Sequence, residues 1–235
     1  MSTRAAHGRV AVLVAVALAS VGLTAIAAPA SAADPCGVGS NPIVCENSKP
    51  GTDPSVWDIQ GAGDSELQGY ATDISVNAGS SIGFKIDTTS SKYTIDIYRT
   101  GWYQGLGARH IASVTPSVAL PQTQPQCVWD ETTELTDCGN WAVSATWNVP
   151  TDAVSGVYVA LLGDTVHNWW SQITFIVRND SSHSDIVYQT SDPTWEAYNT
   201  YGGSDFYQGG GPGRAYKISY NRPFATRNWV QGRDF

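Results

Sequence analysis

The chain has 235 residues, with 13 lysines and arginines against 21 aspartates and glutamates, for a formal net charge of −8 at pH 7. Because phosphate contacts need clustered basic side chains, this excess of acids argues against a nucleic-acid binder. A hydrophobic fraction of 42% and an aromatic fraction of 11% exclude intrinsic disorder. The charge is uneven, because residues 34–183 hold 16 acidic and 6 basic side chains, whereas residues 184–235 hold five of each.

Residues 1–33 are predicted to be a signal peptide. Arg4 and Arg9 precede an uncharged run of alanine, valine, leucine and isoleucine over residues 10–28, and the small residues Ala30 and Ala32 then form a cleavage pattern. A transmembrane anchor is the alternative, because the run is about long enough to span a bilayer. Its alanine content and the cleavage pattern favour removal, so we expect a secreted protein without a membrane anchor after cleavage.

The four cysteines fall into two close pairs. Cys36 and Cys45 are nine residues apart, and Cys127 and Cys138 are eleven apart. Four cysteines allow three pairings, but this spacing favours two local disulfides. A zinc site is the alternative, and the absence of any C-x-x-C spacing argues against it.

Residues 34–183 predict an immunoglobulin-like antiparallel β-sandwich. Short alternating or β-branched runs recur between turn residues, with no helical apolar period between them. The predicted strands are residues 70–77, 81–87, 93–99, 142–147, 156–162 and 172–178. The chain has no Cys…Trp…Cys pattern across the sheets, so it is not an antibody-type domain.

Aromatic residues of this module suggest two roles. The set comprises Trp102, Tyr103, Trp129, Trp141, Trp169 and Trp170. Exposed rings would suit carbohydrate binding, whereas buried rings would fill the core or a domain interface. Large aromatics bury well, so the second role is favoured.

The segment 184–235 differs in composition, with eleven aromatic residues and seven glycines. Its pattern predicts a buried strand over 185–190, a short helix over 194–200 that begins near Pro193, and a further strand over 215–220. A strand that leads into a helix N-terminus is how open α/β sheets begin.

Two strings in this segment, IVYQTSDPTWEAYNTYGGSDFY and AYKISYNRPF, resemble the N,N-dimethylformamidase large (beta) subunit family, in particular its secreted actinobacterial members. The resemblance extends over the mature chain. It implies that 184–235 is the incomplete start of an α/β domain similar to glutamine amidotransferases, which follows the sandwich.

The resemblance also implies an activity, the hydrolysis of a small amide at one iron ion held by two tyrosinates and a glutamate. Tyr198 and Tyr207 match the tyrosine ligands, and the carboxylate ligand would lie beyond Phe235. Hard anionic oxygens suit ferric iron, which would act as a Lewis acid. Glu196 is a weaker candidate for a general base, and Arg222 is expected to be solvated or structural.

Residues 184–235 are enough for one strand–helix unit and part of another, so we expect an N-terminal fragment whose partner is the missing C-terminal α/β domain. Such a fragment would be inactive, and its aromatic tail would lack a covering surface. The alternative function is a non-catalytic secreted sandwich that binds carbohydrate or a cell-surface partner.

Overall fold

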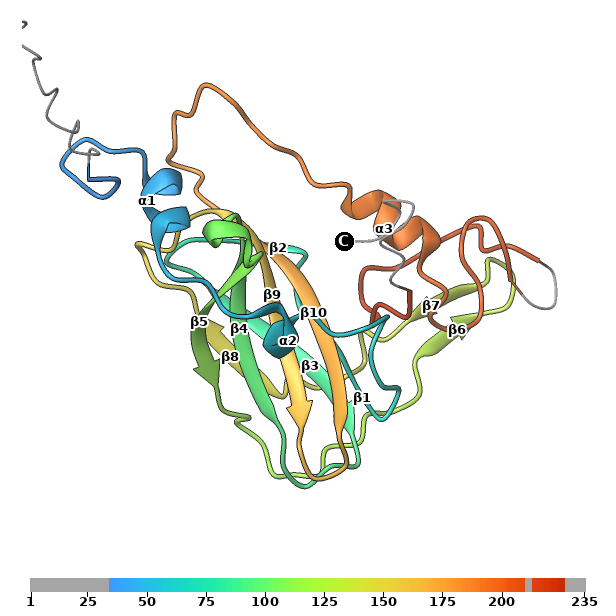
Figure 1. Ribbon diagram of the computed structural model, residues 1–235. Coiled ribbons are helices and arrows are strands. Elements are labelled where there is room, and N and C mark those ends of the chain that lie inside the picture. Colours follow the sequence, from blue (N-terminus) through green and yellow to red (C-terminus); the bar gives the residue numbers. More distant parts are fainter. Residues whose placement is uncertain (1–33, 210–212, 227–235) are drawn as a thin grey trace, which may run out of the picture. The chain divides into compact units, whose positions relative to one another are not determined.

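The computed structural model describes residues 34–209 and 213–226, so the predicted signal peptide lies outside the described residues. The order of the five-stranded sheet is β2-β10-β9-β4-β5, and that of the three-stranded sheet is β1-β3-β8 (Figure 1). The strands of the first sheet are β2 (Ser75–Asn77), β4 (Thr94–Thr100), β5 (Ala108–Val114), β9 (Gly156–Asp164) and β10 (Trp169–Arg178), and those of the second are β1 (Leu67–Ala71), β3 (Ser81–Thr88) and β8 (Ala145–Asn148).

Strands β6 (Val128–Asp130) and β7 (Leu135–Asp137) form a separate hairpin. The helices are α1 (Pro42–Ser48), α2 (Pro54–Trp57) and α3 (Asp192–Tyr198), with a 3₁₀ turn η1 at Tyr103–Gly105. All strand pairs are antiparallel except β10 with β2. None of the described helices is long and apolar enough to cross a bilayer.

Side chains of both sheets form one hydrophobic core. In β3, alternate residues are buried, as expected for a strand with one face on the core. Phe84 of β3 packs edge-on against Phe175 of β10, with ring centroids 5.6 Å apart. Trp147 of β8 contacts Tyr158 and Phe175 in the same core. The mostly β, sandwich-like fold is therefore confirmed, whereas its immunoglobulin-like detail stays a prediction.

The predicted strand over 70–77 is divided in the structure. The chain leaves the three-stranded sheet after β1, bends, and enters the five-stranded sheet as β2. The alternation continues through the bend, so the pattern alone does not show the change of sheet. The bend between β1 and β2 also forms one wall of a small cavity.

Both predicted disulfides are present. Cys36–Cys45 lies at α1, and Cys127–Cys138 flanks the β6–β7 hairpin. Burial would by itself raise the pKa of Glu46 in α1, but hydrogen bonds from Lys49, Arg109 and Tyr103 hold this pKa below its usual value. Because Arg109 and Tyr103 belong to β5 and η1, Glu46 ties the first helix to the sandwich.

The six aromatics of the sandwich have different environments. Tyr103 and Trp141 are buried, as the favoured role of core or interface residues predicts. Trp102 and Trp129 are exposed, and Trp169 and Trp170 are half-buried at the start of β10.

The predictions of strands over residues 185–190 and 215–220, in the segment 184–235 that we call the tail, are wrong. Among the described residues 184–209 and 213–226 the structure contains no ladder strand, and Ile186, Val187 and Tyr188 are strongly exposed. An apolar run forms a strand only where a neighbouring strand supplies hydrogen bonds, and none of the described strands pairs with it. The predicted helix is present as α3, which begins two residues earlier, at Asp192.

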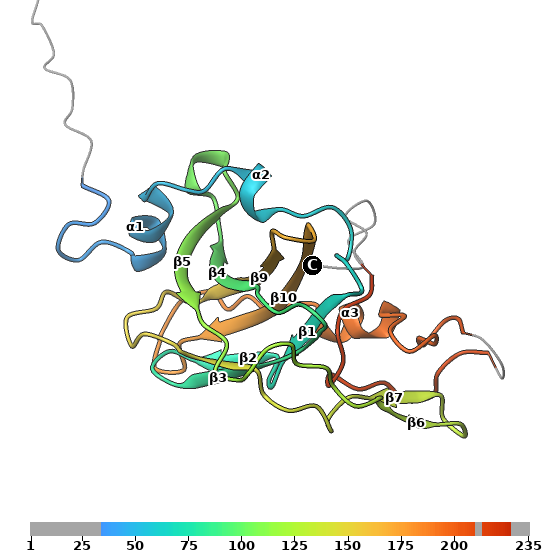
Figure 2. The same ribbon diagram turned by 90° about the horizontal axis from the view of Figure 1, so that it is seen from below.

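The later part of the tail packs on the hairpin, whereas Ile186, Val187 and Tyr188 are strongly exposed, so the expectation that the tail lacks a covering surface is wrong only for the part that contacts the hairpin. The backbone nitrogen of Tyr216 donates to the carbonyl of Thr133 at 2.8 Å, and that of Cys138 donates to the carbonyl of Asn221 at 2.6 Å. Both views place α3 near β6 and β7 (Figures 1 and 2). Tail and sandwich belong to one compact unit, and the predicted division at residue 184 stays a prediction.

Candidate functional site

Helix α3 carries the residues around which the candidate site is built. Asp192 and Pro193 occupy its first turn, where a carboxylate and a proline are both favourable. Trp195, Glu196 and Ala197 are buried, and Tyr198 ends the helix. A helix of two turns thus delivers an acidic side chain to the interior and a phenol to its end.

Arg222 forms a buried ion pair with Glu196. The distance between Arg222 Nε and Glu196 Oε2 is 3.3 Å, and each side chain is only 1% exposed. The guanidinium also donates to the carbonyl oxygens of Ser219, Tyr201 and Glu196 at 3.0–3.1 Å. Arg222 is therefore structural, which was one of the two expected roles. Glu196 is committed to the same network, so its geometry does not support the role of general base.

Asn199 forms a second link between the same two segments. Its side chain is fully buried, and its Nδ2 donates to the carbonyl of Pro223 at 2.9 Å. Its Oδ1 accepts hydrogen bonds from the backbone nitrogens of Tyr201 and Ala225. The strings TWEAYN and SYNRPF, which are 26 residues apart at Glu196 and Arg222, thus fold into one hydrogen-bonded unit.

Burial raises the pKa of Glu196 to about 7, against the opposing effect of Arg222 and of the hydrogen bond from Asn199. Desolvation disfavours the charged carboxylate, and one arginine does not fully offset it. The pKa of Glu196 therefore depends on how completely the tail buries its carboxyl group.

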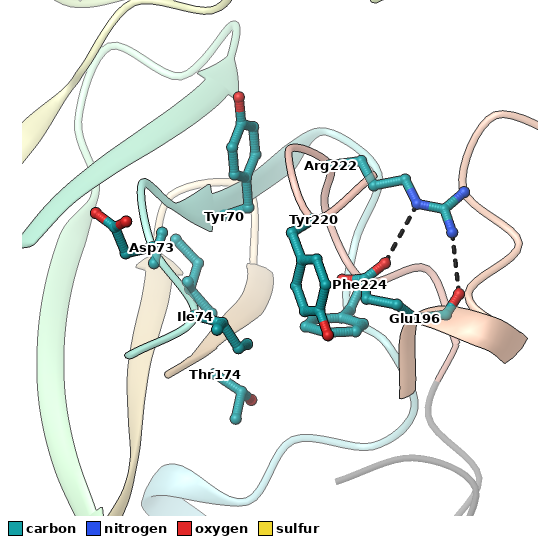
Figure 3. Close-up of a pocket in the computed structure, with 10 residues that line it drawn as sticks. Tyr70, Asp73, Ile74, Thr174, Glu196, Tyr220, Arg222 and Phe224 are labelled. Carbon is teal, nitrogen blue, oxygen red and sulfur yellow. Dashed lines mark hydrogen bonds and ion pairs between the residues drawn. The ribbon is translucent and has the colours of Figure 1, made fainter. Parts of the chain in front are cut away.

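A small cavity lies between the sandwich and the tail (Figure 3). Its volume is about 20 Å³, which is sufficient for about one water molecule. Tyr70, Asp73, Ile74 and Thr174 line it from the sandwich, and Glu196, Tyr220, Arg222 and Phe224 line it from the tail. Oγ1 of Thr174 is buried without a hydrogen-bond partner among the described residues. The cavity is too small for an amide substrate.

The structure brings Tyr198 and Tyr207 together. Their rings stack with centroids 4.4 Å apart and planes inclined by 16°. Tyr207 is held in place by its backbone nitrogen, which donates to Asp205 Oδ1 at 2.6 Å, and the backbone nitrogen of Phe206 donates to the carbonyl of Ala197. A hydrogen bond with Tyr198 raises the pKa of the Tyr207 hydroxyl, so the two phenol oxygens are close neighbours.

Two buried carboxylates were not identified from the sequence. Glu134 Oε2 accepts a hydrogen bond from Ser204, and Asp205 Oδ1 accepts two from the backbone. The other oxygen of each carboxylate is buried without a partner among the described residues. Within the described part of the chain, no group of three or more histidines, cysteines, aspartates or glutamates could hold a metal ion. That Tyr198 and Tyr207 are iron ligands stays a prediction.

Comparison with known proteins gives one family match. The model of the family described as N,N-dimethylformamidase beta subunit-like, C-terminal, matches residues 94–234. No curated protein matches. Among solved structures, the alkylpurine DNA glycosylase AlkC of Pseudomonas fluorescens, bound to DNA with an abasic site analogue, has a TM-score of 0.27 at 13% identity. The match covers 49% of this chain and only 31% of that one, and a likeness at this level carries no argument about function.

Proposed function

Because the chain belongs to the N,N-dimethylformamidase beta subunit-like family, we propose that it takes part in iron-dependent hydrolysis of the carbon–nitrogen bond of a small amide. In this proposal the protein is secreted, and Tyr198 and Tyr207 supply two of the iron ligands. The observation that supports the ligand assignment is the stacking of these rings at 4.4 Å, although one ends a helix and the other lies in a loop.

The chemistry of this donor pair fits ferric iron. Phenolate oxygens are hard, anionic ligands, which suit a hard trivalent cation. The hydrogen bond that the Tyr207 hydroxyl donates to Tyr198 and the neighbouring carboxylate of Asp205 contribute to the raised pKa of Tyr207, which favours the neutral phenol. A nearby cation favours the ionised form, so binding would release protons from these hydroxyls. Bound iron would supply a Lewis acid that polarises the amide carbonyl.

We propose that the remaining ligands of the iron site come from further α/β elements, which act as a partner of this chain. The apolar segment Ile186, Val187 and Tyr188 supports this, because it is strongly exposed and unpaired with any described strand. An extended apolar segment of this kind is suited to strand addition, in which a neighbouring sheet edge supplies the backbone partners. We propose that it docks on such an edge, and that the chain alone does not hydrolyse amides.

The ligand assignment is tested by loading the full chain with ferric iron. We expect bound iron by elemental analysis, together with a visible phenolate-to-iron charge-transfer band. Tyr198→Phe and Tyr207→Phe should each abolish the band and reduce the iron content at least tenfold. Tyr188→Phe is the matched control, because Tyr188 is an exposed tyrosine of the same tail. Unchanged iron content in both site variants would refute the assignment.

A further inference from the structure

A second cavity shares no residue with the tyrosine pair or the small cavity. Its volume is about 510 Å³, and its walls are helix α2 with the segment that follows it and the turn into β10. This volume lies within the range of about 300–1,000 Å³ that is typical of small-molecule sites. Trp170 and Asn168 line it on one side, and Asp58, Gln60 and Asp64 line it on the other.

The indole of Trp170 is held in a fixed orientation. Trp170 is paired with Gly163 across β10 and β9, and a Cβ atom at residue 163 would come within 2.5 Å of Trp170 Cζ3. The ring therefore lies directly over the glycine backbone. Its Nε1 donates to Asn168 Oδ1 at 3.2 Å, which fixes the ring from the side. The indole, which also packs against the buried cluster of Tyr98, Ala108 and Leu161, therefore contributes to the lining with little freedom to move.

Asn168 has the left-handed backbone conformation, with φ of 59°. Asparagine is among the residues that tolerate this region, and such conformations cluster at binding sites. Since Oδ1 of Asn168 accepts from Trp170, the amide nitrogen is the remaining donor of that side chain.

The two walls are joined by hydrogen bonds between Asp64 and Trp170. The nitrogen of Asp64 donates to the carbonyl of Trp170, and the nitrogen of Trp170 donates to Asp64 Oδ2, both at 2.7 Å. Gly63, with φ of 91°, pairs with Ser171, and a Cβ atom there would lie 2.6 Å from the carbonyl oxygen of Trp170. The cavity is therefore formed before any ligand arrives, which lowers the entropic cost of binding.

We infer that this cavity binds a neutral saccharide. Its lining contains an indole, two carboxylates and two amides, and no lysine, arginine or histidine, so it would repel anions. The apolar C–H face of a sugar ring would pack on Trp170, while ring hydroxyls would donate to Asp58 and exchange hydrogen bonds with Gln60 and Asn168. An organic cation is disfavoured, because one oxygen of Asp64 already accepts from Trp170 and the amides supply donors that a cation does not use.

The inference is tested by calorimetric titration of the full chain with three neutral trisaccharides (cellotriose, maltotriose and N,N′,N″-triacetylchitotriose). Binding of at least one is expected, with a loss of tenfold or more in Trp170→Ala. Asn168→Gly is the second variant, because glycine accepts the left-handed backbone and leaves the fold intact. It should also weaken binding, by threefold or more.

Trp102→Ala is the matched control, since Trp102 is exposed and does not line the cavity. Two results would overturn the inference. One is that none of the three sugars binds, including the case in which choline binds instead. The other is that Trp102→Ala weakens binding as much as both cavity variants do. Neither result depends on iron, so the outcome is independent of the proposed hydrolysis.

Discussion

Glu196 Oε2 and Arg222 Nε lie 3.3 Å apart in the interior of the tail, and each side chain is 1% exposed. The pair joins helix α3 to the last described segment, and it lines the small cavity against the sandwich. Tyr198 lies at the end of the same helix, so the ion pair helps to fix its position.

Arg222→Ala is expected to destabilise the fold by about 3–5 kcal/mol, because it leaves a buried carboxyl and the carbonyls of Tyr201 and Ser219 without their donor. Urea unfolding measures this loss. Arg214→Ala is the control, since Arg214 is exposed and lies over the ring of Tyr216, and it should change stability by less than about 0.5 kcal/mol. A loss below about 1 kcal/mol in Arg222→Ala would contradict the structural role.

Glu196 predicts a fall in stability as pH rises. Its pKa in the folded state is about 7, above the value of 4.5 expected for an exposed glutamate. Between these values the folded state retains a proton that the unfolded state has lost, so each rise in pH favours unfolding. The contribution amounts to about 3 kcal/mol and is lost by the time the pH is well above 7. In Glu196→Gln this dependence should disappear, and an unchanged pH profile of the unfolding free energy would disprove it.

Glu46 predicts the opposite slope at lower pH. Its hydrogen bonds lower its pKa below 4.5, so its contribution is present above pH 4.5 and is lost as pH falls through the folded-state value. Glu46→Gln should cost about 2–3 kcal/mol at pH 7, because Arg109 loses its buried anionic partner. As pH falls through the folded-state pKa of Glu46, the variant and the wild type should converge. Glu66→Gln, at an exposed site, should match the wild type across the same pH range.

The second disulfide is predicted to hold the tail in place. Each disulfide closes a short loop and stabilises the fold by about 2–3 kcal/mol. Replacing Cys127 and Cys138 with alanine should also accelerate hydrogen exchange in residues 196–226, because Cys138 donates to Asn221. Replacing Cys36 and Cys45 should lower stability by a similar amount without that effect. Equal hydrogen-exchange rates of the tail in the two variants would rule out a specific link between the second disulfide and the tail.

The sandwich was predictable because its strands carry their own signal. Alternation in β3 and β4 and the apolar runs of β9 and β10 identify strands whose partners lie in the same sheets, and cysteine spacing identified both disulfides. The structure of the tail could not be predicted in the same way. Residues 185–190 have a strand-like composition, but strand formation depends on a neighbour that the described chain does not supply.

The candidate site was predictable only in part. Family resemblance selected Tyr198 and Tyr207, and their stacking is a tertiary contact that no spacing rule encodes. The partnership of Glu196 with Arg222 was missed for the same reason, since the two are 26 residues apart and both residue types are usually exposed. The saccharide cavity depends on the backbone of Gly163 beneath Trp170, which composition does not show.

The buried network of Glu196, Asn199, Arg222 and Pro223 also constrains how this sequence can change over evolutionary time. A neutral residue at position 222 would leave the acid of position 196 without its buried cationic partner, so neither site can drift alone. Homologues that have lost the arginine are therefore expected to have lost the glutamate as well. The two short strings would then be inherited as a single unit, although 26 residues separate them.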